Sequence, residues 1–484
     1  MFCSNVVSNP FILSAALLLL FSFFCTHLLC GAFYFVLFTA TGALLFLVLA
    51  QVWFTHLCGL IPVFILFGFC LPGDIRSDFI IVFGLAAALV IKKVVLARSS
   101  IRFEPAAVPM LVMASFPMLS GIISYLSNSE GELLLSSIMK TQYWFRVFIL
   151  GMLAKYACFD QKTLKKSFGF FYLAAMLVCI EGVMETFNMI PGSVLSALNA
   201  FIPEHYRVFR VEMLTFESIR SSGILGSPID LGFLALFMLW FTVNFRESLV
   251  VKFNWKLAAC IFLITGFFTA SKVFFSGVLF VVLFELFGRR QRRYLLAATT
   301  VLVLAAILSL KMAEQGRAPA SVMHVVYRVK LLTEQGFYAT FFKTRFDPET
   351  GNLAPSFRRI SQNPWFGGGL MQFREVVYGD SFHITTLVNH GIAGLLFFHM
   401  IILYYILRLK TMSISAEDRF LRSLGHTVMC MLLFSIFAGI GTDTFTMRKL
   451  SEINYFFLFA LILTPWHSLK HETRKFSDQP SGGR

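Results

Sequence analysis

Apolar residues along this chain run in long stretches, separated by short segments of polar and charged residues. A typical stretch is about 20 residues long, the length that an α-helix needs to cross the hydrocarbon core of a bilayer. The stretch from 11 to 50 lacks the alternation of apolar and polar positions that a membrane β-barrel requires. The pattern therefore predicts an all-α polytopic membrane protein with about 14 transmembrane helices, in a range of roughly 12 to 14. The predicted spans are residues 11–30, 33–52, 56–72, 79–96, 106–127, 133–158, 167–187, 224–245, 257–271, 273–288, 294–310, 383–407, 423–441 and 453–468.

Composition supports the same class of protein. Hydrophobic residues make up 57% of the chain and charged residues 14%, whereas a soluble domain carries about 25% charge. These values exclude a soluble enzyme and an intrinsically disordered chain. The net charge is +15, but no long soluble basic face is available, so nucleic acid is not an expected partner. All nine cysteines except Cys3 lie in or beside apolar stretches, which predicts buried apolar side chains and not disulfides or metal ligands.

Basic residues in the short loops predict the orientation of the spans. When the spans are counted, each basic set falls on the same side, and the positive-inside rule makes that side cytoplasmic. Both termini are then expected in the cytoplasm. The sets are Lys92, Lys93, Arg98 and Arg102; Lys162, Lys165 and Lys166; Arg246, Lys252 and Lys256; Arg289, Arg290, Arg292 and Arg293; Arg408, Lys410, Arg419 and Arg422; and Lys470, Arg474 and Lys475.

Two long polar loops, residues 188–223 and 311–382, fall on the opposite, external face. The second is about 70 residues long and precedes the last three helices, and an idle connection is rarely so long. Its many lysines and arginines suggest that it serves an external anion. We expect residues 1–470 to form a single transmembrane domain, followed by a short cytoplasmic tail at 471–484.

Arg220 is the first candidate for binding that anion. It precedes a predicted span, and Gly223, Gly226 and Pro228 allow the backbone to turn tightly before the helix begins. An arginine in this position can hold a phosphate through two parallel hydrogen bonds. The alternative is a side chain that reaches the membrane interface or pairs with Glu217.

Lys272 lies between two short spans, and an external turn there would bring it to the same layer as Arg220. The alternative for Lys272 is a simple anchor at a helix end. Glu181, Glu185 and Asp230 fall in the same external layer, where they are expected to pair with the arginines. A second pair of unusual charges, Lys140 and Arg146, lies within the apolar sixth span and indicates a broken or tilted helix.

Arg358 and Arg359 form a basic pair before a glycine-rich segment that ends at Gly369. Successive glycines let backbone N–H groups converge on an anion, although a flexible loop with interfacial aromatic residues would have the same composition. Asp380 and His383 follow, three residues apart on one face of the predicted twelfth span. Asp380 could also cap that helix, and His383 could simply pack between helices.

These motifs resemble the O-antigen polymerase and O-antigen ligase superfamily. Arg358 through Gly369 is similar to the family's pattern of an arginine, ten residues and a glycine. Arg220 resembles the family's arginine before a middle span, and Lys272 stands where the family has the arginine of a Ser-Arg pair. The plan of many spans with one large external loop near the end is also similar. The resemblance covers roughly residues 167–445.

The resemblance implies a fold like that of GT-C glycosyltransferases and a metal-independent transfer without a cofactor. A glycan would move from an undecaprenyl pyrophosphate carrier to a hydroxyl acceptor at the periplasmic face. Arg220, Arg358 and Lys272, with Arg359 and Gly369, would bind the pyrophosphate, and Asp380 or His383 would accept the acceptor's proton. A chain-length regulator is a further partner that the resemblance suggests.

The residues at the start of the predicted twelfth span distinguish the two branches of the superfamily, the polymerases and the ligases. The ligases carry a His-Asn pair eleven residues before a Gly-Ile or Gly-Leu turn, whereas Asp380-Ser381 stands there in this chain. The sequence therefore favours a polymerase of lipid-linked repeat units over a ligase that delivers glycan to lipid A core or protein. A second alternative, from another class, is a transporter or flippase of lipid-linked oligosaccharide.

Overall fold

The computed structural model describes most of the helical part of the chain. The described residues are 46–116 without 48, 69, 72–74 and 104; 131–198 without 188; 202; 221–246; 254–287; short pieces and single residues between 300 and 365; and 381–442, 445 and 449–463. The predicted spans 11–30 and 294–310 and the tail 471–484 therefore lie wholly or largely outside the described residues.

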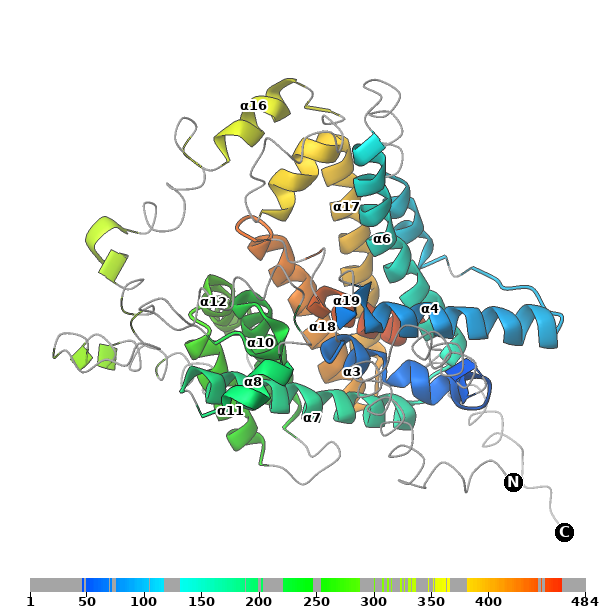
Figure 1. The fold of residues 1–484 in the computed structure, drawn as a ribbon, viewed down its shortest axis with the longest axis horizontal. Helices are drawn as coiled ribbons and strands as arrows, with labels where there is room; N and C mark the ends of the chain where they lie inside the picture. The colour runs from blue at the N-terminus through cyan, green and yellow to red at the C-terminus, as the bar shows by residue number, and fades with distance from the viewer. Residues whose placement is uncertain are drawn as a thin grey trace, which may run out of the picture.

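The described elements are helices, apart from a small hairpin (Figure 1). Strands β1 and β2 pair antiparallel, with Cys70 opposite Arg76 and Leu71 opposite Ile75. In chain order the elements are α3 (Ile61–Leu66), β1 (Cys70–Leu71), β2 (Ile75–Arg76), α4 (Ser77–Val90), the π-helix η1 (Ile91–Leu96), α6 (Gly131–Ala157), α7 (Gln161–Thr186), α8 (Gly192–Leu198), the 3₁₀ turn η3 (Gly223–Leu225), α10 (Pro228–Phe245), α11 (Trp255–Phe268), α12 (Lys272–Phe287), α16 (Ala354–Gln362), α17 (Phe382–Ser415), α18 (Arg419–Ala438) and α19 (Lys449–Leu463).

Five helices among the described residues are long and apolar enough to cross a bilayer: α4 with η1, α7, α10, α17 and α18. The chain is thus a helical, multi-pass membrane protein, as the sequence predicts at this coarser level. Helix α7 begins six residues before its predicted span at 167. Its start is fixed by Asp160, whose carboxylate accepts a hydrogen bond from the backbone N–H of Thr163 at 3.1 Å. A cap sets this end of the helix, so the polar first turn is helical despite its lysines.

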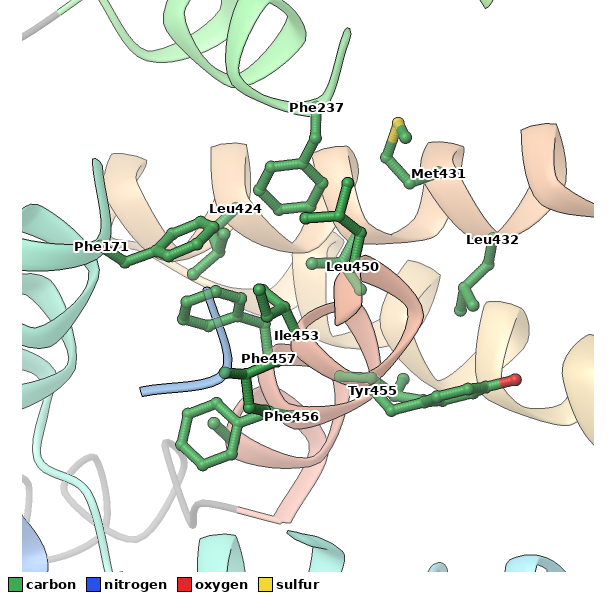
Figure 2. Packing of buried hydrophobic residues seen from close by; sticks show 14 of the residues in the cluster. Phe171, Phe237, Leu424, Met431, Leu432, Leu450, Ile453, Tyr455, Phe456 and Phe457 are labelled. Atoms are coloured by element: carbon green, nitrogen blue, oxygen red, sulfur yellow. The ribbon is translucent and has the colours of Figure 1, made fainter. Parts of the chain in front are cut away.

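Helix α19 lies at the centre of the packed helices, and its described side chains are buried on all sides except at the last two residues. Figure 2 shows Leu450 facing Phe237 of α10, and Phe457 facing Phe171 of α7. The ring centroids of Phe457 and Phe171 are 5.4 Å apart, and many further phenylalanine pairs fill the core in tilted or edge-on contacts. Such pairs contribute about 0.5–1.5 kcal/mol each beyond the area that they bury. Packing therefore uses much of the chain's phenylalanine.

Helix α17 is two helices joined at Gly391, not the single predicted span 383–407. Gly391 has φ 65° and ψ −168°, a backbone conformation that is essentially restricted to glycine. In a continuous helix residues sixteen apart are separated by about 24 Å. Here the ring centroids of His383 and His399 are 5.1 Å apart, and those of Phe382 and Phe398 are 4.6 Å apart. The first leg, 382–390, therefore folds back along the second leg, 392–415, and Figure 1 shows the bend.

Several helix ends that lie beside basic residues are in contact with one another. The ammonium of Lys165 lies over the ring of Phe245, 5.4 Å from its centroid, so the start of α7 meets the end of α10. Phe245 in turn packs on Phe420 at 5.7 Å, in the first turn of α18 beside Arg419 and Arg422. These helix ends lie together, as the predicted topology requires. Which side of the membrane they face remains a prediction.

The five described cysteines for which the structure gives a bonding state are free thiols. Cys58, Cys179 and Cys430 are buried, as the sequence predicts for apolar side chains. The prediction is wrong for Cys158 and Cys260, which are exposed. Cys158 ends α6, and Cys260 lies on α11 next to the exposed Leu257 and Ile264, so a position within an apolar stretch did not decide burial.

Candidate functional site

The backbone turn that follows Arg220 has the form that its glycines predict. Gly223 and Gly226 have φ values of 53° and 71°, in the left-handed region that favours glycine. Ser227 caps α10, and Pro228 occupies its first turn. The helix begins at Pro228 and not at 224, because the 3₁₀ turn η3 comes first.

Two carboxylates at the end of α7 hold this turn. Glu185 Oε2 accepts a hydrogen bond from the backbone N–H of Gly223 at 2.7 Å. Glu181 Oε2 accepts one from Ile224 at 2.9 Å. Hydrogen bonds to ionised acceptors are worth roughly twice as much as neutral ones. The sequence did not predict this support of the backbone by Glu181 and Glu185. Their pairing with arginines stays a prediction.

Lys272 lies beside the same turn. The N–H of Ser221 donates to the carbonyl of Phe268, the last residue of α11, at 3.1 Å. A three-residue turn then leads to Lys272, which begins α12 and is partly exposed. On the other side of this turn, a Cβ at Gly232 would contact Ser271 at 3.1 Å, so α10 and the start of α12 approach closely here. Ser221 and the end of α11 therefore lie side by side, four residues before Lys272. That Arg220 and Lys272 share one layer stays a prediction.

His383 packs against the end of α18. Its Nε2 lies 2.7 Å from the carbonyl of Ile436, and its backbone N–H donates to Gly439 at 3.4 Å. Because a carbonyl only accepts, the short contact assigns the proton to Nε2 and leaves Nδ1 as the basic nitrogen. Nδ1 is buried and has no hydrogen-bond partner among the described residues. The cap of α17 is Ser381, whose Oγ accepts from the N–H of Ile384 at 3.3 Å, and not Asp380 as the sequence suggested.

The loop that carries Arg358 is docked on α17. Leu353, before α16, packs on Ile384 and Val388 of the first leg of α17. Arg358 is exposed on the opposite face of α16. Beyond α16, the carbonyls of Pro364 and Trp365 accept hydrogen bonds from the backbone N–H groups of residues 392 and 393, at 2.8 and 3.1 Å. The break at Gly391 exposes those N–H groups, so it also provides the attachment for the loop.

The remaining predicted site residues cannot be placed in this arrangement. Arg220, Asp380 and Gly369 lie outside the described residues, and Arg359 is described only as part of α16, without its side chain. Among the described residues, no group of three or more histidine, cysteine, aspartate or glutamate side chains could hold a metal ion.

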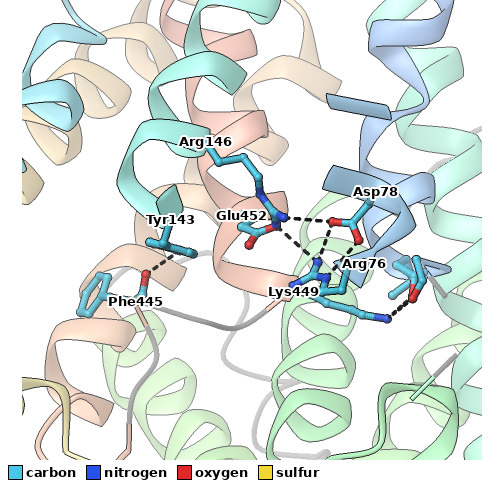
Figure 3. Close-up of polar contacts among 9 residues, drawn as sticks. Arg76, Asp78, Tyr143, Arg146, Phe445, Lys449 and Glu452 are labelled. Atoms are coloured by element: carbon cyan, nitrogen blue, oxygen red, sulfur yellow. Dashed lines mark hydrogen bonds and ion pairs between the residues drawn. The ribbon is translucent and has the colours of Figure 1, made fainter. Parts of the chain in front are cut away.

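A second polar site, which the sequence did not predict as a unit, is buried between α4, α6 and α19 (Figure 3). Asp78 and Glu452 are the carboxylates, and Arg76, Arg146 and Lys449 are the cations. Arg76 binds Asp78 through two hydrogen bonds of 3.0 and 2.7 Å. Arg146 forms an ion pair with Glu452 and lies 3.3 Å from Asp78. We call these five residues the ionic network.

Several neighbours complete the ionic network. The guanidinium carbon of Arg146 lies 3.8 Å from the centroid of the Phe79 ring, a cation–π distance. Lys449 Nζ donates to the carbonyls of Leu66 and Gly68, at 3.3 and 3.0 Å, and so ties the end of α3 to α19. A Cβ at Gly68 would collide with the Asp78 carboxylate, so glycine is required there. Because Asp78, Arg146 and Glu452 are at most 1% exposed, the network is screened from solvent.

The sequence identified only one member of the ionic network as unusual. It suggested that Arg146, with Lys140, marks a broken or tilted sixth span. The helix is not broken, because α6 is continuous from Gly131 to Ala157. Asp78 and Glu452 were assigned to loops because each lies within a turn of a predicted helix start. Charged residues inside a membrane domain usually pair with one another, and that rule would have suggested a search for carboxylate partners.

No protein-family model matches the chain, and neither does any curated protein sequence.

Proposed function

We propose that this protein is a glycosyltransferase that polymerises oligosaccharide repeat units carried on undecaprenyl pyrophosphate, at the periplasmic face of a bacterial inner membrane. Lys272, Arg358 and Arg220 bind the pyrophosphate, assisted by Arg359 and the glycine-rich segment. The leaving pyrophosphate develops negative charge as its bond to the sugar breaks. Fixed cations stabilise that charge without reorganisation of solvent.

The observation that carries the proposal is the contact between the two turns. The backbone of Ser221 bonds to the end of α11, which brings the residue after Arg220 next to the turn before Lys272. This contact supports a site in which Arg220 and Lys272, from distant parts of the sequence, act together on one pyrophosphate. The rigid support from Glu181 and Glu185 suits a site that must hold a phosphate in a fixed position.

His383 is the proposed base for the acceptor hydroxyl. Its Nε2 is engaged by the carbonyl of Ile436, so the lone pair on Nδ1 is the one available to take a proton. The carboxylate of Asp380 is the alternative base, three residues away in the sequence. His383 also lies on the leg of α17 on which α16 packs, which is the helix that carries Arg358.

Chain elongation by the purified protein tests the proposal. The protein in detergent is given undecaprenyl-pyrophosphate-linked repeat units, and the products are separated by length. We expect a ladder of products, reduced about 100-fold by Arg220→Ala, Arg358→Ala or Lys272→Ala, the loss typical of one removed transition-state contact. Lys330→Ala is the matched control, since Lys330 belongs to the same predicted loop as Arg358 and forms an exposed ion pair with Glu334. Normal elongation by all three variants would refute the assignment.

Polymerase and ligase differ in the acceptor. Deletion of a polymerase leaves single repeat units on the cell surface, whereas deletion of a ligase leaves none. The same strains, complemented with the variants above, connect the biochemical result with the cell. We expect single repeat units after deletion.

The ionic network favours one rival, a transporter of lipid-linked oligosaccharide. Transport proteins use paired charges inside the membrane domain as gates and coupling sites, and Arg146, Asp78 and Glu452 form such a buried set. Elongation in detergent separates the two functions, because no compartment exists there to cross. Flipping of labelled lipid by reconstituted protein, without elongation, would favour the transporter.

A further inference from the structure

The position of His383 depends on where the first leg of α17 lies. The reversal at Gly391 packs this leg along the second leg, so that His383 stacks on His399 with ring centroids 5.1 Å apart and ring planes at 29°. Nδ1 of His399 lies 2.7 Å from the carbonyl of Leu395, which holds that ring on the second leg. The hydrogen bond from His383 to Ile436 requires the first leg to keep its place, because hydrogen bonds weaken steeply when their geometry changes.

A buried phenylalanine from another segment packs between the two legs. Phe445 lies between α18 and α19, and its ring centroid is 5.0 Å from that of Phe382 and 4.9 Å from that of Phe398. Phe382 and Phe398 also contact each other, at 4.6 Å. The three residues are at most 4% exposed. Because a close-packed interior transmits displacements, a shift of the Phe445 ring shifts the first leg of α17.

Helix α6 holds Phe445 in place. The hydroxyl of Tyr143 donates a hydrogen bond to the carbonyl of Phe445 at 2.7 Å (Figure 3). Phe445 is 1% exposed, and a buried carbonyl that loses its donor is destabilised. The next residue on α6, Trp144, packs on Phe398 with ring centroids 5.8 Å apart. Helix α6 therefore supports both the second leg of α17 and the segment that carries Phe445.

The ionic network fixes the same segment at a second point. Arg146 follows Tyr143 by three positions, on the same side of α6, and it pairs with Glu452 of α19. Glu452 follows Phe445 by seven positions, so α6 holds the chain both before α19 and within its first turn. Figure 3 shows the two contacts that α6 makes. The network keeps α6 and α19 in a fixed relation, and within that relation Tyr143 places Phe445.

We propose that Tyr143 is a positioning residue for the glycosyl transfer described above. It acts through Phe445, which sets the first leg of α17 and with it the imidazole of His383. The catalytic part of this inference rests on the proposed function, since His383 affects the rate as the proposed base. The geometric part is the dependence of the His383 hydrogen bond on the Tyr143 hydroxyl, and it can be measured without any activity.

Chain elongation in a double-mutant cycle tests the catalytic part. Tyr143→Phe removes one hydroxyl and keeps the ring. A misplacement of 1 Å can lower a rate about 100-fold, so we expect a smaller shift to lower kcat about tenfold, with little change in KM. In the His383→Gln background the same substitution should lower kcat by less than about twofold, because the group that it positions is gone. Equal losses in the two backgrounds would indicate a merely structural role and would overturn the proposal.

Tyr404→Phe is the matched control for the cycle. Tyr404 is 37% exposed on the second leg of α17, where its ring lies against the Arg408 guanidinium. This variant should elongate glycans as the wild type does. Normal elongation by Tyr143→Phe as well would overturn the proposal and leave the proposed function standing.

Solid-state NMR of the full-length protein in lipid, with isotope-labelled histidine ring nitrogens, tests the geometric part. His383→Gln identifies the His383 signals by their loss. In the wild type we expect the tautomer with its proton on Nε2, since that nitrogen donates to the carbonyl of Ile436. Tyr143→Phe should give a mixture of the two tautomers, and Tyr404→Phe should give the wild-type spectrum.

The two measurements distinguish failure of this inference from failure of the proposed function. Unchanged His383 signals in Tyr143→Phe would overturn the inference even in a protein that elongates glycans. A wild-type protein without elongation, whose His383 tautomer nevertheless changes in Tyr143→Phe, would refute the proposed function and leave the placement of His383 by Tyr143 intact.

Discussion

Replacement of Glu452 by methionine tests how the ionic network contributes to stability. In the native protein the three cations of the network, Arg76, Arg146 and Lys449, face two carboxylates, which gives a net charge of 3 − 2 = +1. Glu452→Met raises this to 3 − 1 = +2 in a region where Arg146 is 1% exposed. The partner of Arg146 is lost, and the remaining carboxylate, Asp78, is already bound by Arg76.

The expected cost follows from the burial of both partners. Removal of one member of a buried ion pair destabilises a protein by about 3–5 kcal/mol, because the remaining charge is left uncompensated. In a chain of this size such a loss corresponds to a drop of about 3–10 °C in the unfolding midpoint. Replacement of both partners, Arg146→Met with Glu452→Met, restores a net charge of +1 and should recover most of the loss, since buried ion pairs are often no better than apolar packing.

Heating the detergent-solubilised protein and measuring the fraction that stays monodisperse gives the midpoint. The matched control is Glu334→Met, which breaks the ion pair of 3.7 Å with Lys330, where the side chains are 55% and 65% exposed. Exposed pairs contribute at most about 0.5 kcal/mol within a helix, so this midpoint should barely move. Equal midpoints for Glu452→Met and Glu334→Met, or a double variant worse than both single ones, would refute the reasoning.

Three other changes probe the site. Gly391→Ala forces a side chain into a glycine conformation and should cost about 1–3 kcal/mol, whereas Gly192→Ala, whose Cβ meets nothing within 4 Å, should leave the unfolding midpoint unchanged. Glu185→Ala leaves the N–H of Gly223 without its acceptor. It should lower the free energy of unfolding by about 1.5–3 kcal/mol and reduce chain elongation. A loss of elongation without any loss of stability would indicate a direct catalytic role instead. His383→Gln should lower the rate of elongation about 100-fold with little effect on the amount of lipid-linked substrate bound, and an unchanged rate would leave Asp380 as the base.

Structural features that depend on neighbouring residues could be predicted from the sequence, whereas features that depend on contacts between distant residues could not. The helices follow from the apolar stretches, since a helix in a membrane satisfies its own backbone hydrogen bonds. The turn at Gly223 and Gly226 was predictable because the left-handed backbone is a local requirement. The reversal at Gly391 was not, because a glycine in an apolar helix also permits close packing, and only contacts sixteen residues apart distinguish the two.

The ionic network illustrates the same limit. Asp78, Arg146 and Glu452 are far apart in the sequence. Only Arg76, two residues from Asp78, is a local partner, and nothing near Arg146 shows which carboxylates it contacts. Each lies at or near an apolar stretch, where a charge can equally well mark the end of a helix. Ser381 and Asp380 differ by one position as caps, a distinction set by the backbone at the start of α17.

We propose that cations from separate segments hold a lipid diphosphate, and binding of that lipid can be measured directly. Undecaprenyl pyrophosphate and undecaprenyl monophosphate are titrated into the purified wild-type protein and into Arg220→Ala, Lys272→Ala and Arg358→Ala, with Lys330→Ala as control. We expect the wild type and the control to prefer the diphosphate, and each of the other three variants to bind it about tenfold more weakly. Equal affinity for the two lipids, or undiminished diphosphate binding by all three variants, would contradict the claim.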